Sequence, residues 1–279
     1  MTDVAPLTFG DMDDHSRPLA ILVHGFPDTP YTWRYAGPRL ADHGYRVVAP
    51  WLPGYTGPLD TPVSAGTYVR AILQVRTDFA GDERTLLVGH DWGANAGYGA
   101  VATAPGDFRK FVALAVPPTA ALGNGIFEYH QLKRSFYIWF IQQVGLAEMA
   151  LVQPGFWEAL WADWSPGYNA SDDIAELRRH VTVDNISAVI SPYRASFNPD
   201  FTDPSAEAET AATMSPPPVA TLCLHGARDG AVGADLLADV APHLPASGSA
   251  FKLVDGVGHF LHLEDPDGIW LRIKEWLDG

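Results

Sequence analysis

Cysteine is nearly absent from this chain, which has one in 279 residues. A single thiol cannot form an internal disulfide or a cysteine-based metal cluster. The one cysteine, Cys223, lies in an apolar stretch at residues 220–224, where a small buried side chain is the expected role. We therefore predict a fold that depends on its hydrophobic core, with no metal and no cofactor.

Basic residues and long apolar runs are also scarce. The chain has 18 Lys and Arg against 33 Asp and Glu, and its formal net charge of -15 would repel nucleic acid and anionic membrane surfaces. No apolar segment is long enough to cross a bilayer, and the first residues lack the basic stretch and apolar run of a secretion signal. We predict a cytoplasmic protein with no nucleic-acid partner and no membrane partner. The oligomeric state is not readable from the sequence, and a homodimer stays open.

The chain does contain a regular alternation of short apolar runs and helical stretches, and 47% of its residues are hydrophobic. Apolar runs bounded by turn residues predict buried strands, and helices between them indicate a mostly parallel sheet flanked by helices on both faces. We predict strands at residues 19–24, 46–50, 85–89, 111–116, 220–225 and 251–254. We predict helices at residues 33–42, 68–80, 94–102 and 269–277.

This alternation stops at about residue 117 and resumes at about residue 217. Aromatic-rich stretches such as residues 136–140 and 156–161 replace it. Prolines stand at both edges of the interruption, and neither a helix nor a central strand continues through such residues. We predict an α/β core over residues 1–117 and 217–279, with a mainly helical cap, or lid, inserted over residues 118–216.

A tight turn joins the predicted strand at residues 85–89 to a helix that starts near Ala94, and Asp91 lies in this turn. Gly89 and Gly93 let the backbone bend sharply and present the side chain above the sheet. A carboxylate in this place, where a serine is usual, needs no activation and suits displacement at a saturated carbon. The alternative role, an ordinary helix N-cap, does not explain the glycines. We interpret Asp91 as a catalytic nucleophile.

Two later strands end beside residues that suit such a nucleophile. Asp229 follows the predicted strand at residues 220–225, and His259 follows the strand at 251–254. Nucleophile, acid and base in that chain order, on loops at strand ends, are the arrangement expected of α/β-hydrolases. We predict that Asp229 orients His259 and that His259 activates water. We treat His90 as a supporting residue at most.

The sequence His24-Gly25-Phe26-Pro27 follows the first strongly predicted strand. A glycine-assisted turn there can aim backbone N–H groups at the site. We predict an oxyanion hole formed by the backbone N–H groups of Phe26 and Trp92, each donor contributing roughly 3–4 kcal/mol. The alternative is a turn without a catalytic role.

These motifs together resemble those of the epoxide hydrolases of the α/β-hydrolase fold, and the similarity spans nearly the whole chain. The motifs that carry the resemblance are His24-Gly25-Phe26-Pro27, Trp33-Arg34, Gly89-His90-Asp91-Trp92-Gly93 and Gly258-His259. Only about eighteen residues precede the strand at residue 19, so we expect the family's opening β-hairpin to be short or incomplete.

The resemblance implies an enzyme that hydrolyses an epoxide, an ether, to a vicinal diol. Asp91 would form a covalent alkyl ester, which His259 hydrolyses with the support of Asp229. The family also has two cap tyrosines that donate hydrogen bonds to the epoxide oxygen, and Tyr137 and Tyr193 match their positions. The implied partners are a small hydrophobic epoxide and water. Both tyrosines have the alternative role of packing in an aromatic cap.

Two other functions stay open. Haloalkane dehalogenases use the same aspartyl ester and hold the halide with a tryptophan such as Trp92, but many have an asparagine where this chain has Phe26, which offers no side-chain donor. A binding protein on the same fold is the third alternative. We predict substrate contacts at Phe26, Trp92 and Trp139, although the cap tryptophans could equally form the cap's own core.

Overall fold

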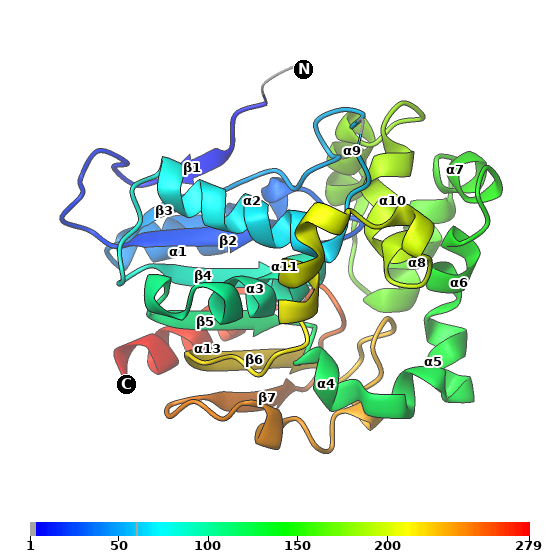
Figure 1. Ribbon diagram of the computed structural model, residues 1–279. Coiled ribbons are helices and arrows are strands. Elements are labelled where there is room, and N and C mark those ends of the chain that lie inside the picture. The colour runs from blue at the N-terminus through cyan, green and yellow to red at the C-terminus, as the bar shows by residue number, and fades with distance from the viewer. Residues whose placement is uncertain (1–3, 60) are drawn as a thin grey trace.

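A seven-stranded sheet forms the centre of the computed structural model, which describes residues 4–59 and 61–279 (Figure 1). The strands lie in the order β1-β3-β2-β4-β5-β6-β7. One pair, β1 with β3, is antiparallel, and the other five pairs are parallel. The strands are β1 (Leu7–Phe9), β2 (Leu19–Val23), β3 (Arg46–Ala49), β4 (Leu86–His90), β5 (Lys110–Leu114), β6 (Ala220–Gly226) and β7 (Ala250–Val254).

The helices include all four that the sequence predicted, with ends that differ by a few residues. No helix in the described part of the chain is long and apolar enough to span a membrane. The α-helices are α1 (Ala36–Asp42), α2 (Ala65–Asp78), α3 (Trp92–Thr103), α4 (Thr119–Leu122), α5 (Tyr129–Arg134), α6 (Phe136–Ile141), α7 (Leu146–Leu151), α8 (Phe156–Trp164), α9 (Ser171–His180), α10 (Ile186–Ala195), α11 (Glu207–Ala212), α12 (Leu261–Glu264) and α13 (Pro266–Asp278). The short 3-10 helices are η1 (Pro30–Arg34), η2 (Pro105–Asp107), η3 (Gly123–Phe127), η4 (Pro199–Phe201), η5 (Pro204–Ala206), η6 (Ala234–Leu236) and η7 (Ala241–His243).

Helices cover both faces of the sheet, as the apolar strands require. All five residues of β2 and all five of β4 are buried, so their side chains need apolar partners on each side. Helices α2 and α3 pack on one face, and α1 and α13 pack on the other (Figure 1). The predicted fold class, a mostly parallel sheet flanked by helices, is therefore confirmed.

The strand that opens the sheet was not predicted. β1 consists of three residues and pairs with β3, with Leu7 opposite Ala49. Its side chains are partly exposed, which gives it no continuous apolar run for sequence analysis to detect. The short opening that the resemblance led us to expect is thus a single edge strand in the described residues.

Between β5 and β6 the described elements of regular structure are all helices, from α4 to α11. Most of these helices gather beyond the carboxyl ends of the parallel strands, at the right of Figure 1. Helix α11 differs, because it packs against α2 and α3 of the core although it lies within the predicted cap range 118–216. The predicted core range 1–117 includes residues 1–3 and residue 60, which lie outside the part of the chain that the structure describes.

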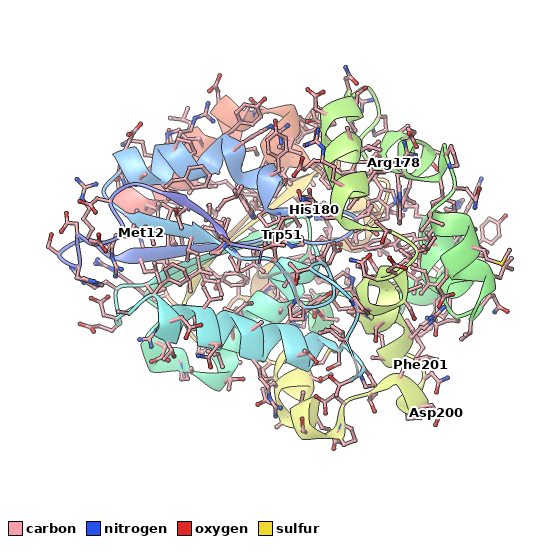
Figure 2. All side chains as sticks on the ribbon, turned by 90° about the horizontal axis from the view of Figure 1, so that it is seen from above. Met12, Trp51, Arg178, His180, Asp200 and Phe201 are labelled. Atoms are coloured by element: carbon pink, nitrogen blue, oxygen red, sulfur yellow. The ribbon has the colours of Figure 1, made fainter. Side chains whose placement is uncertain are left out.

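Several contacts fix the inserted helices to the core. Arg34 of η1 forms an ion pair with Asp173 of α9, with 2.7 Å between Nη1 and Oδ1. Trp51, in the loop after β3, lies against His180 at the end of α9, with ring centroids 4.3 Å apart (Figure 2). The indole N–H of Trp161 donates to the carbonyl of Pro27. Polar and aromatic contacts thus join the insertion to the loops that follow β2 and β3.

Candidate active site

The site is centred on the turn between β4 and α3, where Asp91 has an unusual backbone conformation. Its φ of 51° and ψ of -118° lie in a region that L-residues avoid, at a cost of about 1–3 kcal/mol. Backbone hydrogen bonds hold this conformation: the N–H of Asp91 donates to Leu114, and its carbonyl accepts from Ala94 and Asn95. The turn therefore presents the side chain in one fixed direction.

Glycines permit the close approaches that this turn requires. A Cβ atom on Gly93 would lie 2.1 Å from the carbonyl oxygen of Val23 in β2. A Cβ atom on Gly25 would lie 2.4 Å from the Cβ of Asp91 itself. Because neither approach leaves room for a side chain, glycine is required at both positions.

The two carboxylate oxygens of Asp91 have different surroundings. Oδ1 accepts a hydrogen bond of 2.8 Å from the backbone N–H of Phe26. Oδ2 lies 3.6 Å from Nε2 of His259. Asp91 is only 7% exposed, and it lines a cavity of about 150 Å³. The structure therefore brings three predicted site residues together at one carboxylate.

Asp229 and His259 form a buried pair next to Asp91. Nδ1 of His259 donates to Oδ2 of Asp229 over 2.9 Å, and the other oxygen of Asp229 accepts from the N–H groups of Ala231 and Val232. Burial alone would raise the pKa of Asp229, but the neighbouring histidines His259 and His225 outweigh it and lower the pKa. Asp229 is thus an ionised acid that fixes the orientation of the His259 ring.

The charge state of His259 depends on both carboxylates. Burial would lower its pKa, but the charge and hydrogen bond of Asp229, followed by the effect of Asp91, raise it to about 10. Nε2 of His259 is buried and has no hydrogen-bond partner among the described residues. The ring is therefore held in place at Nδ1 and is free to exchange a proton at Nε2.

Both predicted tyrosines lie in the wall of the cavity that Asp91 lines. Tyr137 of α6 and Tyr193 of α10 line the cavity together with Asp91 and Trp92. Burial, followed by the negative charge of Asp91, raises the pKa of both phenols well above the usual value. The Tyr193 hydroxyl has no hydrogen-bond partner among the described residues. Two protonated phenols are thus available as donors within the cavity.

Two predicted side-chain contacts with substrate do not lie in the cavity wall. Trp139 packs against Phe197, with ring centroids 4.8 Å apart, because a residue two positions after Tyr137 on a helix points to a different side. The ring of Phe26 packs against the rings of Trp157 and Tyr193, and the backbone N–H of Phe26 donates to Asp91. The N–H of Trp92 stays a predicted oxyanion donor.

Sequence reasoning missed the residues of the insertion that hold the loops carrying Asp229 and His259. The carbonyl of Trp164, the last residue of α8, accepts from the N–H groups of Gly230 and His259, at 3.1 and 3.0 Å. The hydroxyl of the next residue, Ser165, accepts from the N–H of Phe260. These are mostly backbone contacts between segments distant in sequence, which leave no local signal.

Gln131 of α5 was also missed. Its amide donates to the carbonyl of Ala231 and accepts from the N–H of Gly233, on the loop that carries Asp229. Gln131 therefore fixes that loop to the helical insertion, and it also lines the cavity.

One group of potential metal ligands occurs among residues 4–59 and 61–279. Atoms of Asp28, His90 and His262 lie within 4.8 Å of one another, and Oδ2 of Asp28 is 4.0 Å from Nδ1 of His90. Two ligands of a tetrahedral zinc ion would be roughly 3.3 Å apart, so this spacing does not fit zinc. His90 donates from Nε2 to the carbonyl of His259, in keeping with its predicted supporting role.

A carboxylate on a strained strand-to-helix turn, served by a histidine and an acid on later strand ends, defines a hydrolase built on a parallel sheet. The match to known proteins agrees with this class. Residues 20–270 match the model of the Alpha/beta hydrolase family, and the chain belongs to that family.

Curated relatives include proteins named for epoxide chemistry. Epoxide hydrolase A of Mycobacterium tuberculosis is 36% identical over 146 residues, which are 48% of this chain and 44% of that protein. This chain thus aligns with less than half of that relative. The AB hydrolase superfamily protein YfhM of Bacillus subtilis is 26% identical over 272 residues, covering 93% of this chain and 90% of that protein.

Solved structures with the same fold cover nearly the whole chain. Epoxide Hydrolase A from Mycobacterium thermoresistibile has a TM-score of 0.73 at 20% identity and covers 98% of this chain and 94% of its own. A haloalkane dehalogenase loop variant from Bradyrhizobium elkanii has a TM-score of 0.76 at 20% identity, covering 98% and 91%. At such identities these likenesses define the fold and do not choose between the two reactions.

The coupling between Asp91 and His259 predicts the effect of removing one charge. In Asp91→Asn the pKa of His259 should fall by about one pH unit or more, because one of the two carboxylates that stabilise the imidazolium is lost. Titration of the labelled imidazole by NMR measures this. The exposed Asp184 supplies the control variant Asp184→Asn, and an equal His259 pKa in all three proteins would contradict the coupling.

The contact from Ser165 predicts a positioning role for the insertion. Ser165→Ala leaves the buried N–H of Phe260 without an acceptor, so the free energy of unfolding should fall by about 1–3 kcal/mol. The loosened loop should also lower the pKa of His259, by weakening its bond to Asp229. Ser165→Thr keeps the hydroxyl and should restore the pKa. Loss of stability with an unchanged His259 pKa would show that Ser165 has only a structural role.

Proposed function

We propose that this protein hydrolyses an epoxide to a vicinal diol through a covalent ester on Asp91. The observation that carries the proposal is that Asp91 and the phenols of Tyr137 and Tyr193 line the same cavity. Ring opening needs a nucleophile and acids in the same cavity, because carbon is attacked while oxygen gains negative charge. Relatives named as epoxide hydrolases support this choice.

The surroundings of Asp91 favour attack through Oδ2. Oδ1 is held by the N–H of Phe26, whereas Oδ2 accepts from no such donor among the described residues and lies 3.6 Å from Nε2 of His259. Oδ2 would form the bond to an epoxide carbon as the carbon–oxygen bond of the ring breaks. Oδ1 then becomes the ester carbonyl and already faces the donor that would stabilise a later oxyanion.

The tyrosines would supply the proton for the released oxygen. Their raised pKa values keep both hydroxyls protonated at neutral pH, so each can donate. As the ring opens, the alkoxide takes a proton from one phenol, and the second phenol stabilises the charge by a hydrogen bond. A carboxylate nucleophile alone would leave that alkoxide unstabilised in a largely apolar cavity.

Ester formation would itself prepare His259 for the second step. Esterified Asp91 is neutral, so one cause of the raised His259 pKa disappears and the ring becomes a neutral base more readily. The proton that His259 carries at neutral pH would first pass to the phenolate left by ring opening. Nε2 of His259 would then take a proton from water as the water oxygen attacks the ester carbonyl carbon. Collapse of the tetrahedral anion releases the diol, whose new hydroxyl takes its proton from the oxygen that water added, and leaves Asp91 as a carboxylate and His259 protonated as at the start.

A second candidate reaction is the displacement of halide. The indole N–H of Trp92 is buried without a partner among the described residues, and Trp92 lines the cavity, so it could hold a departing halide. That reaction uses the same ester but needs no acid for its leaving group. The two tyrosines therefore favour the epoxide over the halide.

Trapping of the intermediate tests the covalent mechanism. His259→Gln incubated with styrene oxide should gain the mass of one substrate molecule on the peptide that contains Asp91, because the ester forms but is not hydrolysed. Asp91→Ala should show no added mass and no turnover. The wild-type protein should release diol from styrene oxide and no bromide from butyl bromide. Bromide without diol would select the halide reaction, and an unmodified His259→Gln protein that binds substrate would exclude the ester.

The tyrosines give a separate test of epoxide chemistry. Tyr137→Phe and Tyr193→Phe should each lower kcat/KM for styrene oxide by about 100-fold or more, since each removes a proton donor. The double variant should have no measurable turnover. Tyr129, whose side chain is 75% exposed, provides the control Tyr129→Phe, which should match the wild type. Full activity in the double variant would remove both tyrosines from the mechanism.

A further inference from the structure

The cavity wall contains an amide with unused hydrogen-bonding capacity, that of Asn95. This residue follows the nucleophile by one helical turn, since its N–H donates to the carbonyl of Asp91 over 3.0 Å. It lines the cavity with Asp91 and Thr119. Its Nδ2 donates to Oγ1 of Thr119 over 3.0 Å, while its Oδ1 is buried and has no partner in the described part of the chain.

A buried polar atom without a hydrogen-bond partner destabilises the folded protein. Gln131, the other amide in the wall, differs in this respect, because it bonds to Ser135, Ala231 and Gly233 and supports the loop that carries Asp229. The side-chain amide of Asn95 can therefore form a hydrogen bond that no described residue supplies. Because Asn95 lines the cavity with Asp91, the partner can be a molecule bound in that cavity.

The neighbours of Asn95 restrict the chemistry of its ligand. The Thr119 hydroxyl can donate or accept, so the amide can turn either its oxygen or its nitrogen to the ligand. A hydroxyl group fits both orientations, because it donates and accepts. A carboxylate or phosphate does not fit, since Asp91 would repel it and no Lys, Arg or His is found among the described residues of the cavity wall.

We propose that Asn95 is a specificity-determining residue that binds a hydroxyl group on the substrate, so that the preferred substrate is a hydroxyl-bearing epoxide. This rests on the proposed function. Asn95 and Asp91 line the same cavity, so the hydroxyl and the attacked carbon belong to one bound molecule and are joined by an alkyl spacer. The rest of the substrate packs on apolar wall residues, among them Leu122, Ile126 and Leu236.

The test compares pairs of terminal epoxides of equal chain length, in which one member ends in a hydroxyl and the other in a methyl group. For the wild-type protein we expect kcat/KM to be about tenfold higher for the hydroxyl member at the spacer length that reaches Asn95. Spacers that are shorter or longer should show a smaller ratio. This comparison needs no variant and so does not depend on the folding of one.

The variant Asn95→Leu has a similar volume but cannot bond to a hydroxyl. Its ratio of kcat/KM for the two members should fall to about one. Asn169 is exposed and is not among the residues that line the cavity, so Asn169→Leu makes the same substitution elsewhere and should keep the wild-type ratio. A wild-type ratio of about one at every spacer length, with diol formed from both members, would overturn the role of Asn95 and leave the proposed function intact. Absence of diol from every epoxide, styrene oxide included, would overturn both.

Discussion

The conformation of Asp91 is the constraint on which the rest of the site depends. A residue with φ of 51° between a buried strand and a helix persists only because bonds to Leu114, Ala94 and Asn95 enforce it. This conformation places one carboxylate oxygen on the N–H of Phe26 and the other near His259. The same turn starts α3, which positions Asn95 in the cavity one turn later. One backbone turn thus sets both the position of Asp91 and part of the cavity wall.

The helical insertion is part of this arrangement and not only a cover over it. The carbonyl of Trp164 accepts from both the loop that carries Asp229 and the loop that carries His259. Gln131 adds a contact to the first of these loops, and Ser165 adds one to the second. Two carboxylates then face one buried histidine and raise its pKa to about 10. His259 is therefore most basic while Asp91 is charged, and we expect it to lose its proton more easily when Asp91 is neutralised. Geometry and electrostatics of the pair depend on the insertion that also carries Tyr137 and Tyr193.

Much of this could be predicted from the sequence, for reasons that are local. Continuous apolar runs predicted the strands of the sheet, because strands buried on both faces have no alternation of apolar and polar residues. Gly89 and Gly93 around Asp91 indicated the turn, and Asp229 and His259 stand directly after strands, whose carboxyl ends meet at one edge of the sheet. The fold class and the meeting of these residues follow from such patterns. β1 escaped detection because three partly exposed residues form no pattern.

Only the tertiary structure decided which side chains reach the cavity and which partners hold them. Tyr137 and Trp139 lie two residues apart, yet only Tyr137 lines the wall, because the rotation of α6 against α10 sets the inward face. Trp164 and Ser165 act through a carbonyl and a hydroxyl on distant loops, and no spacing in the sequence records such contacts. By itself the sequence determined that Asp91 lies on a strand-to-helix turn with an acid and a histidine to serve it. The packing of the insertion on the strand ends determined what surrounds that carboxylate, since long-range contacts depend on how whole elements meet.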